Sequence, residues 1–332
     1  MTLYIDPPLW PGHGTTWSHL VSDTSLSELH AFAAQAGLQR RAFDLDHYDV
    51  PASRVSDLVA AGAVATSGRE LLARLTASGL RVRGRDRAAA KRGVLLARWS
   101  ALLPGVPGAA EIGRALLVRW YEPHRAYHGP GHLTHVLDSL AVLEGDEPAP
   151  RAVHLALWFH DAVHEGRAGA DEEASAALAE TLLAPLVAPL TTPLLAPPTG
   201  HRAPADPADR SAPAALSPTA APLTRAEVSE VARLVLVTRD HAPDPGDRAG
   251  SLVSDADLAI LASAPDRYAR YVAQVRAEYS HVPDAAFTTG RAAVLEQLIT
   301  TTPLYRTPAG SLRWEAAAQA NLRSELAGLI SS

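Results

Sequence analysis

The chain has 332 residues, 47% of them hydrophobic, and a formal net charge of −6 at pH 7, which suits about two globular domains. It contains no cysteine, which excludes disulfides, zinc ribbons and thiol nucleophiles and leaves His, Asp and Glu for any metal site. The negative charge gives no general attraction for nucleic acid or an anionic membrane, so neither partner is expected.

The first residues, MTLYIDPPLWPGHG, lack the basic start and the apolar run of a signal peptide. Nowhere does the chain contain the run of about 18 apolar residues that a membrane-spanning helix needs. We therefore expect a cytoplasmic protein. The sequence does not predict its oligomeric state.

Residues 1–84 alternate short apolar runs with helical stretches, which is typical of a small α/β domain. The apolar runs are 3–5, 41–45 and 63–66, and the predicted helices are 26–36, 54–61 and 68–80. Ser25 and Glu28 have the spacing of a capping box at the start of the first helix. Residues 85–92 are charged and small, and we interpret them as a linker.

Residues 93–332 are predicted to be all helical, so the chain as a whole is mainly α. Apolar residues recur at helical spacing in ten segments, which are 94–103, 109–121, 133–143, 151–163, 172–186, 225–238, 255–262, 266–279, 284–299 and 313–330. The stretch 188–222 is too rich in Pro and Ala to pack as a helix or strand, and we expect a mobile surface insertion there.

Imidazoles and carboxylates of the helical part gather at residues 122–132, 158–166, 238–241 and 254–261. The sequence Gly-Pro-Gly at 129–131 must break a preceding helix, which places His132 in the first turn of the next one. His160 and Asp161 follow five apolar residues, at the end of a buried helix where an unpaired carboxylate is costly. A bound cation would relieve that cost.

Several motifs occur here in a fixed order, and they are HRAYH at 124–128 with His132, LALWFHDAVH at 155–164, DEEASA at 171–176, Thr238 with His241, DADLAIL at 255–261, Gly290-Arg291 and LYRT at 304–307. Together they resemble the HD superfamily of metal-dependent phosphohydrolases over nearly all of residues 95–328 apart from the insertion. The resemblance implies an all-helical HD-type fold. His164 stands where that pattern usually has Tyr, which offers an extra ligand or proton carrier, and Asp171 stands where Asn is common.

The resemblance implies a divalent metal held by His132, His160, Asp161 and Asp255, without distinguishing Mn, Mg, Co, Fe and Zn. Asp255 and Asp257 both lie in the same short motif, and residues two apart on a helix face different ways. We expect Asp255 to be the ligand and Asp257 a catalytic carboxylate, with the exchange of the two as the alternative.

The remaining site residues are expected to bind substrate or to assist catalysis. The resemblance makes His128 and His241 candidates for a second metal or for phosphate contacts, since multi-histidine HD enzymes use extra imidazoles in this way. Arg125, and after it Arg291, are candidates for phosphate clamps, because a guanidinium matches phosphate bidentately; Arg291 could instead pair with an acid on its own surface. Glu172 would orient the attacking water or protonate the leaving oxygen.

The resulting hypothesis is hydrolysis of a phosphate ester or anhydride of a small, nucleotide-like substrate by a metal-activated water. Two alternatives stay open. One is a regulatory module that keeps the metal or ligand pocket without catalysis, and the other is a di-iron oxygenase on the same helical scaffold.

Residues 1–83 resemble a small bacterial domain of uncharacterised function, so the resemblance implies no activity. This part is rich in acids and imidazoles, and they are Asp6, His13, His19, Asp23, Asp44, Asp46 and His47. Asp6 follows an apolar run, at the carboxyl end of a predicted strand where ligand sites gather in α/β sheets. The alternative is that these residues are solvated loops and helix caps.

Overall fold

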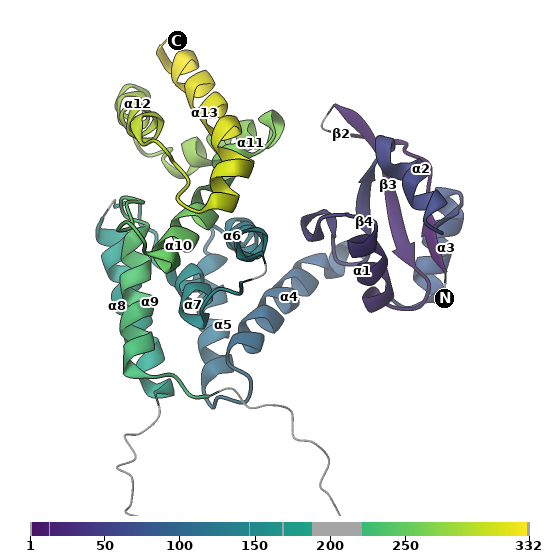
Figure 1. The fold of residues 1–332 in the computed structure, drawn as a ribbon, viewed down its shortest axis with the longest axis horizontal. Coiled ribbons are helices and arrows are strands. Elements are labelled where there is room, and N and C mark those ends of the chain that lie inside the picture. Colours follow the sequence, from purple (N-terminus) through teal and green to yellow (C-terminus); the bar gives the residue numbers. More distant parts are fainter. Residues whose placement is uncertain (1, 13, 146, 168, 188–220, 331–332) are drawn as a thin grey trace, which may run out of the picture. The chain divides into compact units, whose positions relative to one another are not determined.

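The computed structural model describes residues 2–330 except 13, 146, 168 and 188–220, and the chain divides into two compact units (Figure 1). Unit 1 is residues 1–95 and unit 2 is residues 96–332. The segment predicted as a linker is helical from Arg87 onward, since it opens helix α4 (Arg87–Leu102). The predicted insertion lies outside the described residues apart from 221 and 222. In the part of the chain that is described, no helix is both long and apolar enough to span a bilayer.

Unit 1 contains a mixed five-stranded sheet. Its strands are β1 (Leu3–Ile5), β2 (Trp10–Gly12), β3 (Thr15–Ser22), β4 (Tyr48–Pro51) and β5 (Val64–Ala65). The long strand β3 pairs antiparallel with β1, β2 and β4, and β5 joins β1 in parallel. Leu20 of β3 has Ile5 as its partner in β1 and Tyr48 in β4. Strands β1 and β4 therefore lie on opposite edges of β3.

Helices cover both faces of this sheet. They are α1 (Leu26–Gln35), α2 (Val55–Ala60) and α3 (Gly68–Ala77). Neighbouring residues of a strand point to opposite faces, so Ile5 packs in one core with Leu29 of α1, whereas Tyr4 packs in the other with Leu71 of α3. The small α/β region expected from the sequence is therefore present.

Two local predictions for unit 1 need correction. Residues 41–45 do not form a strand, because the chain turns through a 3-10 helix (Arg40–Ala42) and then places Leu45 at φ 67°. The capping box is only half formed. The Ser25 side chain accepts a hydrogen bond from the Glu28 backbone N–H at 3.2 Å, but the Glu28 carboxylate accepts the Ser22 hydroxyl instead.

The regular elements of unit 2 among its described residues are all helices or 3-10 turns, and the only β-type pairing there is an isolated bridge between Val187 and Leu223. After α4 its helices are α5 (Ala109–Trp120), α6 (Pro130–Glu144), α7 (Arg151–Phe159), α8 (Ala170–Leu183), α9 (Arg225–Val237), α10 (Arg248–Leu258), α11 (Pro265–Glu278), α12 (Asp284–Thr300) and α13 (Pro308–Ile330), with 3-10 turns η4 (Ala184–Leu186) and η5 (Ala259–Ala262). Together with α4 they correspond to the ten predicted segments, although α4 and α10 each begin seven residues before their predicted starts at 94 and 255, and α7 ends four residues before its predicted end at 163.

Helix α7 is the core of unit 2, because its residues from Leu155 to Phe159 are all fully buried. Helices α6, α8, α9 and α10 all pack against it. Buried tryptophans lock the neighbouring helices, and the Trp120 indole N–H donates to the Trp158 carbonyl at 3.0 Å. At Gly113 of α5 an added Cβ would overlap the Trp99 ring, so the close contact between α4 and α5 requires glycine.

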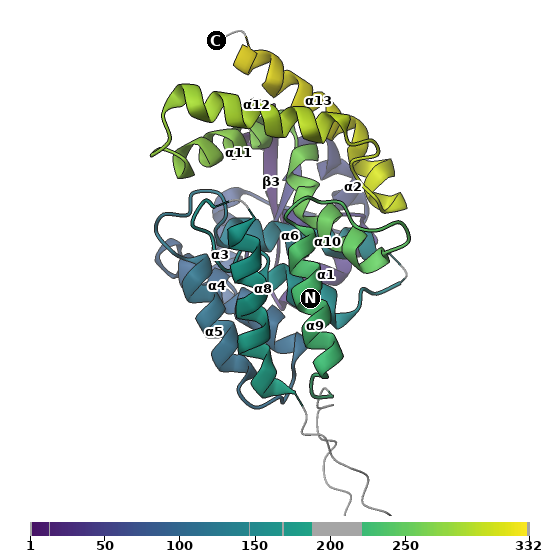
Figure 2. The ribbon, with the colours of Figure 1, turned by 90° about the vertical axis from the view of Figure 1, so that its left-hand side faces the viewer.

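Helices α11, α12 and α13 lie together at one end of unit 2 (Figures 1 and 2). Helix α12 packs along α13, and α13 also contacts α6 and η5. The start of α6, the end of α7 and the end of α10 therefore meet next to this C-terminal group. That meeting point holds most of the residues singled out by the sequence.

Candidate metal centre

Three segments supply the side chains of what we call the central cluster, namely His132, His160, Asp161 and Asp257. Pro130 occupies the start of α6, where its fixed φ suits the first turn and its missing N–H costs nothing. His132 therefore lies in that first turn, as the sequence predicts. His160 is the C-cap of α7, Asp161 follows it, and Asp257 lies in the last turn of α10.

The donor atoms of His132, His160 and Asp257 all lie within 4.8 Å of one another, and Asp161 approaches the same two imidazole nitrogens. The Nε2 atoms of His132 and His160 are 3.0 Å apart. Asp161 Oδ2 lies 3.4 Å from His132 Nε2 and 3.1 Å from His160 Nε2, and Asp257 Oδ1 lies 3.1 and 3.5 Å from the same two atoms. Two ligands about 2.1 Å from one cation lie roughly 3 to 4 Å apart. The donor set therefore fits a divalent metal.

The electrostatics of the cluster are those of a strongly coupled site. Burial alone lowers the pKa of His160, but the charges of Asp161 and Asp257 raise it well above its ordinary value. Burial raises the pKa of each of these carboxyls, but the charge of His160 and the hydrogen bonds from the imidazoles lower it by more. The two carboxylates are thus held ionised in a buried place, which is the condition for binding a cation.

The ring of His160 is fixed in the orientation that a ligand needs. Its Nδ1 lies 2.8 Å from the Leu157 carbonyl oxygen. Because a carbonyl only accepts, Nδ1 carries the proton and Nε2 keeps its lone pair in the neutral ring. Metal-binding histidines are usually held in this way by a second hydrogen bond.

The expected ligand Asp255 is not part of the central cluster, which corrects that expectation. Its fully buried carboxylate accepts the backbone N–H groups of Arg306 and Thr307 at 2.8 and 2.7 Å and the Thr307 hydroxyl at 2.6 Å. It thereby fixes the turn before α13. Asp257, two residues later on the opposite side of α10, occupies the place expected for Asp255.

Arg125 is engaged by the protein itself and not directed at a substrate phosphate. Its guanidinium donates to the carbonyls of His128, Asp161 and Ala162 at 3.1, 2.6 and 3.3 Å, and it pairs with the Glu122 carboxylate at 3.0 Å. The side chain is only 1% exposed. These contacts use all the nitrogens of the guanidinium group. Arg125 therefore connects the loop before α6 to the segment after α7 by hydrogen bonds.

A second group of donors, which we call the lateral cluster, consists of His128, His164 and Glu278. Glu278 Oε2 lies 2.6 Å from His128 Nδ1 and 3.6 Å from His164 Nε2. The other oxygen, Oε1, accepts the backbone N–H groups of Tyr127 and His128. The ring centroids of His128 and His132 are 5.5 Å apart, so the lateral and central clusters are neighbours.

The sequence reasoning missed Glu278, although a signal for it exists. Tyr268, Tyr271 and Val275 are buried along one face of α11, and Glu278 continues their spacing of three and four residues. A carboxylate in phase with a buried stripe needs a partner. Tyr127 was likewise assigned no role from its motif, yet its buried hydroxyl has no hydrogen-bond partner among the described residues and its ring packs against His132.

The other predicted site residues lie as follows. His241 borders the central cluster, with its Nε2 3.7 Å from Asp257 Oδ2 and its Nδ1 3.2 Å from the Ser254 hydroxyl. Arg291 forms a bidentate pair with Glu325 at 2.7 and 3.0 Å, which is the alternative that the sequence left open for it. Glu172, in the first turn of α8, has one buried carboxylate oxygen without a hydrogen-bond partner in the described structure.

The candidate residues of unit 1 separate into two groups. Asp23 and Asp44 have structural roles, since Asp23 accepts the Thr2 backbone N–H and Asp44 pairs with Arg87. His13 lies outside the described residues. The others, which are Asp6, His19, Asp46 and His47, lie close together on the sheet.

Comparison with known proteins finds one family. Residues 3–78 match the family described as protein of unknown function (DUF4031), in agreement with the uncharacterised domain expected at residues 1–83. These findings include no match to an HD domain. No curated protein and no solved structure gives a significant match. The chain is therefore similar, over its first unit, to a family without an assigned activity.

Proposed function

We propose that unit 2 is a metal-dependent hydrolase with an HD-type site, acting on a phosphate ester or anhydride of a small, nucleotide-like substrate. The observation that carries the proposal is the central cluster, in which two imidazole nitrogens lie 3.0 Å apart and a carboxylate oxygen of Asp161 and one of Asp257 each lie 3.1 to 3.5 Å from both nitrogens. The ordered motifs of the HD resemblance give the reaction class, and the nucleotide part rests on that resemblance alone.

A divalent cation held by His132, His160, Asp161 and Asp257 would supply the Lewis acidity that phosphoryl hydrolysis needs at neutral pH. The chain itself supplies position and proton transfer. Burial lowers the pKa of His241, which favours its neutral imidazole. We assign to its Nε2, 3.7 Å from Asp257 Oδ2, the exchange of a proton with a substrate oxygen.

From the sequence, arginines were expected to neutralise the charge of the substrate phosphate, and we now assign that role to the lateral cluster. The guanidinium groups of Arg125 and Arg291 are already paired within the protein, so neither is assigned to neutralise the phosphate. Burial lowers the pKa of His128, and the hydrogen bond from His128, together with the nearby His164 imidazole, holds the pKa of Glu278 far below its usual range. His128, His164 and Glu278 offer donor atoms within 4.8 Å of one another, and we assign a second divalent cation to them.

The test is metal analysis of the purified chain together with a phosphatase and nucleotidase screen in Mn²⁺, Mg²⁺, Co²⁺ and Fe²⁺. We expect metal-dependent phosphate release from the wild type and its loss in Asp161→Ala. Bound metal without release of phosphate from any compound would favour the regulatory module. Iron with the spectroscopic signature of a di-iron centre and consumption of oxygen would favour the oxygenase. A chain that binds no metal would contradict the proposal.

Glu278→Gln tests the second cation. The amide oxygen can still accept the Tyr127 and His128 backbone N–H groups, but the group no longer carries the charge that a cation needs. We therefore expect the number of bound metal ions, measured by elemental analysis after dialysis, to fall by one while the central ion is kept. The matched control is Glu144→Gln, because Glu144 also pairs with an imidazole, that of His154 at 3.0 Å, outside both clusters. Equal metal content in Glu278→Gln and the control would argue against a second cation.

A further inference from the structure

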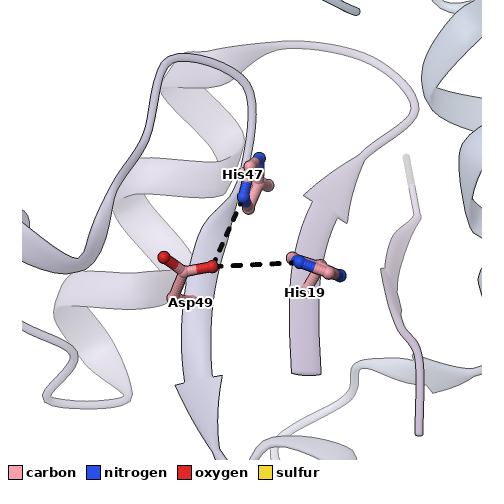
Figure 3. Close-up of side chains that lie close together, drawn as sticks. All are labelled: His19, His47 and Asp49. Carbon is pink, nitrogen blue, oxygen red and sulfur yellow. Dashed lines mark ion pairs between the residues drawn. The ribbon is translucent and has the colours of Figure 1, made fainter. Parts of the chain in front are cut away.

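In unit 1 the sheet brings two histidines and an aspartate together at one edge. His19 lies on β3, His47 precedes β4, and Asp49 lies on β4, opposite His19 in the strand register. Figure 3 shows both imidazoles turned toward the Asp49 carboxylate. Asp49 Oδ1 is 3.4 Å from His47 Nε2 and 4.0 Å from His19 Nε2, and the two ring centroids are 4.9 Å apart. We call these three residues the sheet-edge cluster.

Each imidazole of the sheet-edge cluster is oriented by its own buried carboxylate. Asp6 Oδ2 lies 3.0 Å from His19 Nδ1, and Asp46 Oδ1 lies 2.6 Å from His47 Nδ1. Asp6 is 4% exposed and Asp46 is fully buried. Burying two carboxylates in so small a unit is costly unless they are fully hydrogen bonded.

Both of these carboxylates are in turn held by the backbone. Asp6 Oδ1 accepts the His19 backbone N–H at 2.5 Å. Asp46 Oδ2 accepts the Val82 backbone N–H at 2.7 Å and a guanidinium N–H of Arg81 at 2.9 Å. These hydrogen bonds hold the two carboxylates in place, and the carboxylates in turn fix the orientation of the His19 and His47 rings.

This arrangement decides which nitrogen of each ring is available. An ionised carboxylate only accepts hydrogen bonds, so Nδ1 of each histidine carries a proton. In the neutral rings Nε2 then holds the lone pair, and both Nε2 atoms face Asp49. Carboxylate, imidazole and metal in line form the arrangement that commonly fixes metal-binding histidines.

We propose that His19, His47 and Asp49 bind a divalent transition metal such as Zn²⁺. Their three donor atoms all lie within 4.8 Å of one another. Ligands about 2.1 Å from one cation lie roughly 3 to 4 Å apart, so binding would require small shifts, chiefly of the exposed Asp49 side chain. Two imidazoles out of three ligands favour Zn²⁺, Fe²⁺ or Co²⁺ over Mg²⁺ and Ca²⁺, which prefer oxygen.

The sheet-edge site would leave coordination positions open on the side that faces solvent. The Asp49 side chain is 45% exposed and that of His19 is 26% exposed, whereas structural zinc sites are closed by four protein ligands. The exposed Trp10 ring stands edge-on to His19, with ring centroids 5.4 Å apart. A small anionic or carbonyl ligand could therefore bind to the metal next to the Trp10 ring. This proposal uses residues of unit 1 alone and does not depend on the activity of unit 2.

The experiment compares Zn²⁺ content of the full-length chain and its variants after stripping with a chelator, reloading with Zn²⁺ and dialysis. We expect the double variant His19→Gln, His47→Gln to hold one Zn²⁺ fewer than the wild type, because the donors of unit 2 are the same in both. Asp49→Asn removes an exposed ligand without disturbing the core and should weaken the binding of that same Zn²⁺ ion. His30→Gln is the matched control, since His30 belongs to unit 1 but bonds to the Tyr48 hydroxyl instead, and it should keep the full content.

A further variant tests the orienting carboxylates. Asp6→Asn should weaken Zn²⁺ binding at the sheet-edge cluster by about 10- to 100-fold, the usual effect of removing such a partner, as measured by calorimetric titration. Circular dichroism would establish that each variant is folded. Zn²⁺ content that is the same in the wild type, the double variant and Asp49→Asn would overturn the proposal, whatever unit 2 binds.

Discussion

Asp257→Asn should lose both bound metal and metal-dependent phosphate release, whereas Asp255→Asn should keep both and lose stability. Asp257 Oδ1 lies 3.1 Å from His132 Nε2, inside the central cluster. Loss of a residue that only orients a ligand typically costs 10- to 100-fold in metal affinity or activity, so loss of a ligand itself should lower the rate by more than about 100-fold.

Asp255→Asn is the matched control because it makes the same chemical change two residues away. The new amide group would place N–H donors against the backbone N–H groups of Arg306 or Thr307, or against the Thr307 hydroxyl, which now donate to the carboxylate. One unsatisfied buried donor costs about 1 to 3 kcal/mol. We expect a lower melting temperature with nearly unchanged turnover of the folded protein. The opposite result, a stable but inactive Asp255→Asn, would restore Asp255 as the ligand.

The helices could be predicted from the sequence because their signals are local. Apolar spacing and Gly-Pro-Gly at 129–131 define the helix that begins with Pro130, and with it the position of His132. The helix before His160 was likewise predicted from its apolar run, although the predicted segment 151–163 extends four residues beyond the end of α7 at Phe159. These signals bring His132, His160 and Asp161 to helix ends that can meet.

The choice between the two aspartates could not be predicted from the sequence, because it depends on which face of α10 meets which neighbour. That helix packs on α6 and α7 on one side and receives the turn at Arg306 and Thr307 on the other. Both faces of α10 are therefore buried and both can hold a carboxylate. Only the tertiary arrangement shows that Asp255 meets backbone N–H groups and Asp257 meets imidazoles.

In unit 1 the strands were harder to predict than the helices. Strand β4 contains only four residues and follows directly after Asp46 and His47, whose polar character indicates a loop. The pairing of β4 with β3 joins residues about thirty positions apart, and it is this pairing that brings Asp49 opposite His19. Composition indicated that acids and imidazoles were abundant in this unit, but the register of two strands decides which of them meet.

Arg125→Ala should destabilise unit 2 more strongly than Asp255→Asn. Three backbone carbonyls, those of His128, Asp161 and Ala162, would lose their charged donor. Hydrogen bonds to charged groups contribute about 1.5 to 3 kcal/mol each, so a loss of at least about 3 kcal/mol in the free energy of unfolding is expected, seen in urea unfolding by tryptophan fluorescence.

Arg125→Lys separates this structural role from a phosphate clamp. An ammonium group keeps the charge but has three donors on one nitrogen, and it cannot reach acceptors spread around a planar fork. We therefore expect an intermediate loss of stability, with KM for a phosphorylated substrate nearly unchanged in the protein that remains folded. A clamp on substrate phosphate would give the reverse, namely a large rise in KM at unchanged stability. Since Arg125 holds the carbonyl groups of His128 and Asp161, one residue from each cluster, the stability of this contact also determines how the two clusters are placed relative to each other.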